Sequence, residues 1–392
     1  MKKEPSIAIY SGEIPSTTFI ERLIEGVSER GCTVYLFGVI SKKNNYNPKV
    51  KVLGYKQHKL YKLMYLLRYT FLLILKRPTE KKRLDQFLAT ENRTDLYSKV
   101  KYYPVLYYCP DLFHLQWAKG IAEWAWVEDF GMKLVLSLRG AHINYSPIAD
   151  RELAETYTKH FPSISGFHAV SKAIAKEAEM YGAKPNKVTV VYSGLQKNDL
   201  VKSEKPKNAV YQIISVGRPH WIKGYRVALD ACKQLKDAGV SFFYTIVGAA
   251  NDMELMYQIY VLGLEDCVRL TKKQPFITVQ QLMFNADLLL LSSHKEGVAN
   301  VVLEAMSLET LVLTTNCGGM NEVIEDGANG FLVPIRDAIL MAQKMKRIMD
   351  LSEHEIATIR QNALNTIEEQ HTEAQMVNGM LSFYNNALKD QP

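Results

Sequence analysis

Two carboxylates, Glu296 and Glu304, stand eight residues apart in a stretch whose pattern could bind a diphosphate. An apolar strand is predicted at 287–291, a short polar loop follows it, and a helix is predicted over 300–309 with Asn300 as its N-cap. The free N–H groups in the first turn of a helix, together with the helix dipole, form a site for anions. Glu296 in the loop and Glu304 about one turn into the helix would then flank the diphosphate. Taken alone, such a pair is more often a loop charge and a solvated helix residue.

Two cations precede this stretch, in the run SVGRPHWIKG at 215–224. Gly217 ends a predicted strand, Arg218 follows it, and Lys223 stands where a helix over 225–238 begins. A run of this kind is usually a strand-to-helix turn with surface cations, so its meaning depends on what surrounds it.

A third turn, 11–19, joins the first predicted strand to the first predicted helix. Gly12 permits close approach of the backbone to a phosphate, and Ser16 or Thr17 could cap the helix. The turn lacks the G-x-G-x-x-G pattern, so dinucleotide binding is not indicated.

Short apolar strands alternate with longer amphipathic helices along the chain, which predicts βαβ units and parallel sheets buried on both faces. A chain of 392 residues also exceeds one ordinary core. We predict an N-terminal Rossmann-like domain over 1–198, a polar linker at 199–208, a second Rossmann-like domain over 209–371, and a final helix, 372–392, that packs back on the first domain. The predicted strands are 6–10, 33–37, 112–116, 133–138, 166–170, 188–192, 210–216, 242–247, 268–270, 287–291, 311–315 and 331–333.

The C-terminal elements, taken in order, resemble the donor-site signature of family 4 retaining glycosyltransferases of the GT-B fold. The likeness is to bacterial members that assemble polysaccharides and exopolysaccharides. The signature has the form E-G-x-x-x-x-x-x-E-A-M, a strand, G-G-x-x-E and N-G-x-L-V. Here it falls at Glu296-Gly297, Glu304-Ala305-Met306, Gly318-Gly319, Glu322 and Asn329-Gly330. The resemblance implies two doubly wound Rossmann-like domains that face a central cleft, the N-terminal one binding acceptor and the C-terminal one binding a nucleotide sugar.

The same resemblance implies a role for each charged residue. Arg218 and Lys223 would hold the donor diphosphate and stabilise the charge that develops as the nucleotide leaves, in place of a metal ion. Glu296 would orient hydroxyls of the donor sugar, and Glu304 would bind the ribose. The chain contains no D-x-D motif, so we expect no metal and no other cofactor. Further donor contacts are expected at Gly12, Gly217, Gly297, Val298, Ala299, Asn300 and Val301.

His142 is the candidate for a catalytic residue near the acceptor and the reacting sugar. Family members often carry a His or Asp after the fourth strand, but their common His-Gly order is replaced here by Arg139-Gly140-Ala141-His142. An isolated histidine at a strand end is as readily a hydrogen-bonded structural residue.

These features together predict a retaining hexosyltransferase that moves a sugar from a UDP- or GDP-sugar to a polysaccharide or a lipid-linked acceptor. Two alternatives stay open. One is a catalytically silent nucleotide-sugar-binding partner in an assembly complex, and the other is a GT-B epimerase. Nucleic acid is not an expected partner, because the C-terminal half is acidic and no nucleic-acid-binding module is recognised.

Composition bears on the compartment and on a further partner. Five scattered cysteines without a C-x-x-C pair, and an N-terminus without an apolar signal region, predict a cytoplasmic protein. Residues 49–83 hold eleven Lys and Arg but one acid, Glu80. Within them, 59–77 is apolar and flanked by cations, but only the 13 residues 63–75 are mainly apolar and Arg68 interrupts them, so the segment cannot span a bilayer. It is either an interfacial helix that contacts an anionic membrane peripherally or a buried helix whose cations reach water.

Overall fold

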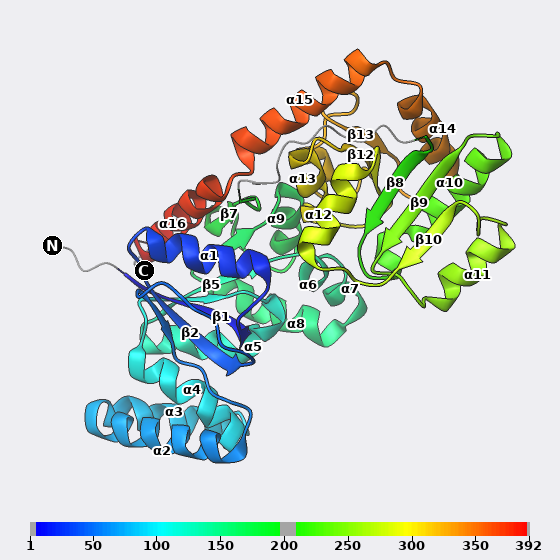
Figure 1. The fold of residues 1–392 in the computed structure, drawn as a ribbon. Coiled ribbons are helices and arrows are strands. Elements are labelled where there is room, and N and C mark those ends of the chain that lie inside the picture. Colours follow the sequence, from blue (N-terminus) through cyan, green and yellow to red (C-terminus); the bar gives the residue numbers. More distant parts are fainter. Residues whose placement is uncertain (1–4, 197–208, 390–392) are drawn as a thin grey trace. The chain divides into compact units, whose positions relative to one another are not determined.

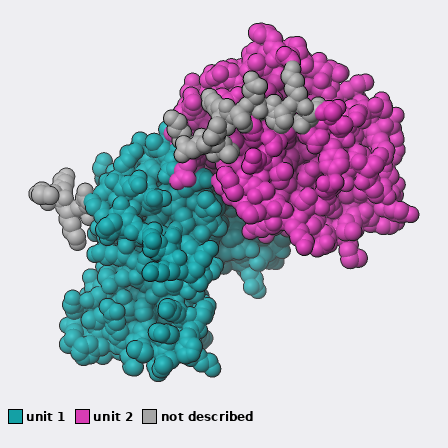
Figure 2. Space-filling model, viewed as in Figure 1, with its two compact units in different colours: residues 1–170, 174–191, 373–392 teal, residues 171–173, 192–372 magenta. Residues whose placement is uncertain are grey.

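Two parallel β-sheets, one in each of two compact units, form the framework of this computed structural model (Figures 1 and 2). The structure describes residues 5–196 and 209–389, so the predicted linker at 199–208 lies outside the described residues. Unit 1 comprises 1–170, 174–191 and 373–392, and unit 2 comprises 171–173 and 192–372. The chain passes into unit 2 at Tyr192, where Leu195 N–H donates to His371 O at 2.8 Å.

The sheet of unit 1 has the strand order β3-β2-β1-β4-β5-β6-β7. All six strands predicted for this half are present. The strand missed by the sequence is β3, whose three residues carry two exposed side chains and so lack the apolar pattern of the others. The strands are β1 Ser6–Ile14, β2 Thr33–Ile40, β3 Val50–Val52, β4 Leu112–Leu115, β5 Lys133–Leu138, β6 Gly166–Ala169 and β7 Val188–Val190.

The sheet of unit 2 has the order β10-β9-β8-β11-β12-β13, and each of its strands was predicted. In β11 all four leucines are buried, as expected of a parallel strand covered on both faces. Strand order reverses between β8 and β11, and loops at the carboxyl ends of such neighbours form the usual ligand site of a doubly wound sheet. The strands are β8 Tyr211–Val216, β9 Phe242–Val247, β10 Val268–Thr271, β11 Leu288–Leu291, β12 Leu311–Thr315 and β13 Phe331–Val333.

Helices connect the strands as the alternating pattern predicts. In unit 1 they are α1 Thr18–Glu29, α2 Lys59–Lys76, α3 Pro78–Thr90, α4 Leu96–Tyr108, α5 Ile121–Trp124, α6 Ala141–Asn144, α7 Ser146–Ala149, α8 Arg151–His160 and most of α9 Lys172–Glu179. In unit 2 they are α10 Tyr225–Asp237, α11 Met253–Val261, α12 Phe276–Asn285, α13 Asn300–Ser307, α14 Ala338–Met349 and α15 Glu353–Gln370.

The final helix, α16 (Glu373–Lys389), belongs to unit 1, where it packs against α1 (Figure 1). Gly26 of α1 allows this close approach, because a Cβ atom there would lie 2.3 Å from a methyl group of Val377. Arg30 also donates to Asn378 across the same contact, at 2.5 Å. Helix α16 is therefore part of the core of unit 1.

A chain of buried hydrogen bonds joins α16 to the sheet of unit 1. His168 Nε2 lies 3.0 Å from the carbonyl oxygen of Val191, so Nε2 carries the proton and Nδ1 accepts from Ser137 Oγ. Ser137 Oγ in turn accepts from His114 Nε2, whose Nδ1 accepts from the Tyr384 hydroxyl at 2.7 Å. Burial, with the nearby Arg139 as a second cause, lowers the pKa of His168 to about 3. Burial, followed by the neighbouring His168, also lowers the pKa of His114. Both imidazoles are thus neutral structural groups.

The basic segment 59–77 folds as α2, which contacts α4, while α4 contacts β2 (Figure 1). Only Tyr69 and Leu73 of α2 are buried. One face of α2 is thus buried in unit 1, while much of the rest of the helix is exposed. Among residues 5–196 and 209–389, we find no helix with the length and apolar character needed to cross a bilayer.

Candidate functional site

Lys223 and Glu296, which are 73 residues apart in sequence, meet in unit 2. Lys223 Nζ lies 2.7 Å from Glu296 Oε1, and the two side chains are 21% and 16% exposed. Lys223 stands just before α10, in the loop after β8, and Glu296 stands in the loop after β11. The site thus lies at the carboxyl ends of the two strands between which the strand order reverses.

Hydrogen bonds between the two loops hold this pair in place. Ser292 Oγ donates to Lys223 O at 2.8 Å, and His294 N–H donates to Ile222 O at 2.7 Å. Gly224 has φ +63°, and a Cβ atom there would lie 2.0 Å from Ser292 O, so only glycine fits between the loops. The family sequence Lys-Gly therefore has a packing reason as well as a chemical one.

Ser293 is a site residue that the sequence reasoning missed. Its hydroxyl donates to Glu296 Oε1 at 2.7 Å, so that this carboxylate oxygen accepts from both Ser293 and Lys223. Two donors on one oxygen fix the orientation of the carboxylate. The only signal in the sequence was a small polar residue three positions before Glu296.

A glycine pair after β12 closes the site from the other side. Gly319 N–H donates to Gly297 O at 2.8 Å. Gly318 has φ +58°, and a Cβ atom there would lie 1.8 Å from Glu296 O. The G-G step of the signature therefore exists because the backbone on both sides of Glu296 is packed against it.

The helix α13 begins one residue away from the predicted cap. Ala299 occupies the N-cap, with φ −78° and ψ 114° and no side-chain hydrogen bond, and Asn300 is the first helical residue. The prediction of Asn300 as N-cap is therefore wrong. The first hydrogen bond of the helix turn runs from Val302 N–H to Ala299 O, which leaves the N–H groups of Asn300 and Val301 ahead of it. Val298 and Ala299 form the short connection that leads from Gly297 to this turn.

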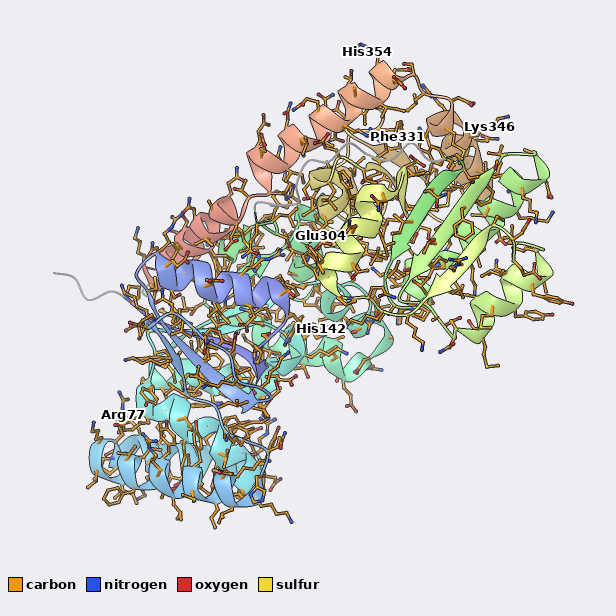
Figure 3. The ribbon with its side chains drawn as sticks, viewed as in Figure 1. Arg77, His142, Glu304, Phe331, Lys346 and His354 are labelled. Carbon is orange, nitrogen blue, oxygen red and sulfur yellow. The ribbon has the colours of Figure 1, made fainter. Side chains whose placement is uncertain are left out.

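Glu304 lies on α13, one turn beyond these N–H groups, and is partly buried (Figure 3). Arg218 follows Gly217 at the end of β8, and its side chain is exposed. Within residues 5–196 and 209–389 we find no ion pair of Arg218 with a carboxylate, so its charge is not neutralised by a described residue.

The Gly217 backbone is held by a buried tyrosine. Tyr225 OH donates to Gly217 O at 3.1 Å, and a Cβ atom at Gly217 would lie 2.8 Å from the same hydroxyl. Burial, followed by the charge of Glu296, raises the pKa of Tyr225 far above its ordinary value. Cys317 immediately precedes Gly318, and burial raises the pKa of its thiol to about 11. Neither group is therefore ionised near neutral pH.

Gly12 and His142 lie in unit 1. Strand β1 continues to Ile14, so Gly12 stands in a bulge of that strand, with φ +91°, and not in the loop predicted over 11–19. The register shift there pairs Gly12 with Gly38 of β2, and a Cβ atom at Gly38 would lie 2.6 Å from Gly12 O. The loop to α1 is correspondingly short. Thr17 is the N-cap of α1 but makes no side-chain cap hydrogen bond, while Ser16 N–H donates to Glu21 Oε1 at 2.6 Å.

His142 is in α6, a single turn after β5 (Figure 3). Its ring centroid lies 5.3 Å from that of Trp117, and its carbonyl oxygen accepts from the Tyr157 hydroxyl at 2.8 Å. Burial, with Lys119 as a second cause, lowers the pKa of its imidazole. Nδ1 is buried without a hydrogen-bond partner among the described residues. The ring is neutral at physiological pH.

With this geometry in hand, the family comparison is decisive for unit 2. Residues 196–365 match the family model described as "Glycosyl transferases group 1". This segment is a group 1 glycosyltransferase domain. It contains Arg218, Lys223, Glu296 and Glu304.

Relatives of the glycosyltransferase domain have names from polysaccharide assembly. The chain is 30% identical over 256 residues to the putative colanic acid biosynthesis glycosyltransferase WcaL of Escherichia coli, covering 62% of each chain. It is 29% identical over 215 residues to the amylovoran biosynthesis glycosyltransferase AmsK of Erwinia amylovora, covering 51% of this chain and 52% of that one. The matched region thus spans about three fifths or less of these relatives.

A solved structure extends the likeness to the whole fold. Anabaena Alr3699/HepE in complex with UDP-glucose superposes with a TM-score of 0.71 and 18% identity, covering 97% of this chain and all of that one. The fold class predicted from the sequence, GT-B with two Rossmann-like domains, is confirmed.

Proposed function

We propose that this protein transfers a sugar from a UDP- or GDP-sugar to a polysaccharide or lipid-linked acceptor with retention of configuration and without a metal ion. The observation that carries the proposal is the contact of Lys223 Nζ with Glu296 Oε1 at the carboxyl ends of β8 and β11, inside a group 1 glycosyltransferase domain. The names of WcaL and AmsK support a polysaccharide-assembling role. The UDP-glucose complex of Anabaena HepE supports a nucleotide-sugar donor.

The charged groups of the site are suited to different parts of the donor. The exposed guanidinium of Arg218, the Nζ of Lys223 and the N–H groups of Asn300 and Val301 are the donors suited to a diphosphate. Glu296 only accepts hydrogen bonds, so it is suited to sugar hydroxyls. Because Lys223 contacts Glu296, a phosphate on Lys223 and a sugar hydroxyl on Glu296 would be neighbours, as they are in a nucleotide-diphosphate sugar. Glu304, one turn into α13, would bind the ribose.

Retention follows in this proposal from a front-face departure. The bond between the anomeric carbon and the diphosphate oxygen breaks, and Lys223 and Arg218 stabilise the negative charge on the leaving diphosphate. The acceptor hydroxyl forms its new bond on the same face and gives its proton to the leaving phosphate oxygen. No protein nucleophile is required. His142, with a neutral ring and an unpartnered Nδ1, is proposed to contact the acceptor or the reacting sugar.

The test is release of nucleotide from a panel of UDP- and GDP-sugars in the presence of a polysaccharide or polyprenyl-linked acceptor, with the anomeric configuration of the product read by NMR. Glu296→Ala is expected to lower turnover about 100- to 1,000-fold, because the loss removes a group that touches the donor. Glu309→Ala, which changes a glutamate of the same domain outside the site, is the matched control. Equal turnover of Glu296→Ala and wild type would refute the assignment.

A separate arm tests metal independence. Activity that is unchanged by EDTA is expected, since in this proposal Arg218 and Lys223 neutralise the diphosphate in place of a metal ion. Loss of activity in EDTA with recovery in manganese would overturn that part of the proposal.

A further inference from the structure

Helix α2 exposes a continuous apolar surface to solvent. Besides Tyr61, seven large apolar side chains of this helix are between 45% and 64% exposed: Leu60, Leu63, Met64, Leu67, Phe71, Ile74 and Leu75. At 3.6 residues per turn they fall within about 120° of arc, and they run about 22 Å along the helix axis. We call this set the α2 apolar stripe. Single exposed apolar residues are ordinary, but a continuous stripe of this kind marks an interaction surface.

The opposite face of the same helix packs against the rest of unit 1. Tyr69 and Leu73 are buried in the core of unit 1, and Tyr65, Leu66 and Leu72 pack against that core. Packing within unit 1 therefore leaves the stripe uncovered. It is a second apolar face on a helix whose first face holds it in place.

Cations surround the stripe. By helical geometry Lys59 and Arg68 lie on its two flanks. Lys76 is the last residue of the helix, and Arg77, which is labelled in Figure 3, is its C-cap. Helix α2 contains no acidic residue. Lys59 and Arg68 are exposed, and neither forms an ion pair with a carboxylate in the described residues 5–196 and 209–389. The rim is thus a strongly positive border around an apolar surface.

We propose that the α2 apolar stripe docks this protein on an anionic lipid surface, with the helix lying in the interface plane. Apolar side chains would enter the boundary of headgroups and acyl chains, while the cations of the rim contact lipid phosphates. A second copy of the chain fits less well, because a two-fold contact through this face would bring two positive rims together. The proposal rests on this surface and is independent of the proposed glycosyl transfer.

A second exposed apolar stripe on the same chain provides a matched contrast. On α11, Met253, Met256, Tyr257, Tyr260 and Val261 are between 53% and 82% exposed. The segment 252–266 around it contains four acids and no Lys or Arg. If exposed apolar area alone caused membrane binding, α11 would contribute as α2 does. If apolar area must be combined with positive charge, only α2 binds anionic lipid.

The experiment is flotation of the full chain with two kinds of vesicle, phosphatidylcholine alone and phosphatidylcholine with an equal amount of phosphatidylglycerol. One variant combines Leu67→Ser with Phe71→Ser, side chains that are 59% and 62% exposed and so not needed for folding. A second combines Lys59→Glu with Arg68→Glu. The control combines Met256→Ser with Tyr257→Ser on α11.

Wild type is expected to float with the anionic vesicles and to be released by salt. Each α2 variant should lose binding about tenfold or more, and the α11 variant should bind as wild type does. Wild type that fails to bind anionic vesicles would overturn the proposal, as would equal loss in the α2 and α11 variants. Size-exclusion chromatography provides a further arm: a wild-type dimer that Leu67→Ser with Phe71→Ser converts to monomer would assign the stripe to a second copy instead.

Discussion

The packing of Gly318 against Glu296 gives a sharp prediction about the site. Alanine at position 318 would retain φ +58° and would place Cβ 1.8 Å from Glu296 O. Ordinary contact begins at 3.4 Å, so the two groups must separate by about 1.6 Å, which is 3.4 minus 1.8. The left-handed conformation costs about 1–2 kcal/mol for a residue with a Cβ, and overpacking costs about 1–3 kcal/mol more. Gly318→Ala should therefore destabilise unit 2 by about 2–5 kcal/mol.

Gly263 supplies the matched control for the backbone term. It has φ +61°, close to that of Gly318, but no atom lies within 4 Å of its would-be Cβ. Gly263→Ala therefore has the conformational cost of a left-handed residue without any steric overlap. The reduction in the entropy of the unfolded chain is the same in Gly263→Ala and Gly318→Ala. The difference between the two variants isolates the contact with Glu296, at about 1–3 kcal/mol.

Differential scanning calorimetry measures this difference. For a unit of this size, 1 kcal/mol shifts Tm by about 2–4 °C, so Gly318→Ala should melt about 2–12 °C below Gly263→Ala. Because the strain falls on Glu296 itself, Gly318→Ala should also lose glycosyl transfer below the temperature at which it unfolds. Equal melting temperatures in the two variants would show that the loops can separate without cost, and the account of the G-G step would then be wrong.

Three further predictions concern other parts of the molecule. Ser293→Ala removes one of two donors to Glu296 Oε1 and should lower turnover about 10- to 100-fold. Ser307→Ala on α13 is the control. Unaltered turnover in Ser293→Ala would mean that Lys223 alone orients the carboxylate. Gly26→Ala should lower the stability of unit 1 against urea, because its Cβ would lie 2.3 Å from Val377. Adding Val377→Ala should restore stability in the double variant. If the stability losses of the two single variants simply add in the double variant, the contact is refuted. The folded-state pKa of His168, about 3, lies below its unfolded value of 6.5. Between these values the unfolded chain binds a proton that the folded chain does not. The free energy of unfolding is therefore highest above pH 6.5 and falls on acidification. Between pH 6.5 and pH 5 the free energy of unfolding should fall by about 2 kcal/mol from this residue, and a flat profile there would contradict the neutral hydrogen-bond chain.

The sequence by itself determined the fold class, twelve of the strands and the residues of the donor signature. It could do so because strands buried on both faces must be continuous apolar runs, and because the charged residues of the donor signature recur at fixed positions between them. Glu296 was predictable since its neighbours in sequence, Gly297 and the E-A-M step, belong to the same signature.

The tertiary structure decided what depends on residues far apart in the chain. Ser293 and Gly318 act on Glu296 through contacts that no periodicity records, and Gly12 proved to be in a bulge because β2 pairs with it. The N-cap of α13 is Ala299 and not the predicted Asn300, because backbone dihedral angles, not side-chain preference, set where a helix begins. For α2, composition gave an apolar and basic segment but left its two faces undistinguished. Only packing against α4 and the core could show that one face is buried in protein while the other faces solvent, because which apolar side chains a helix covers depends on its neighbours.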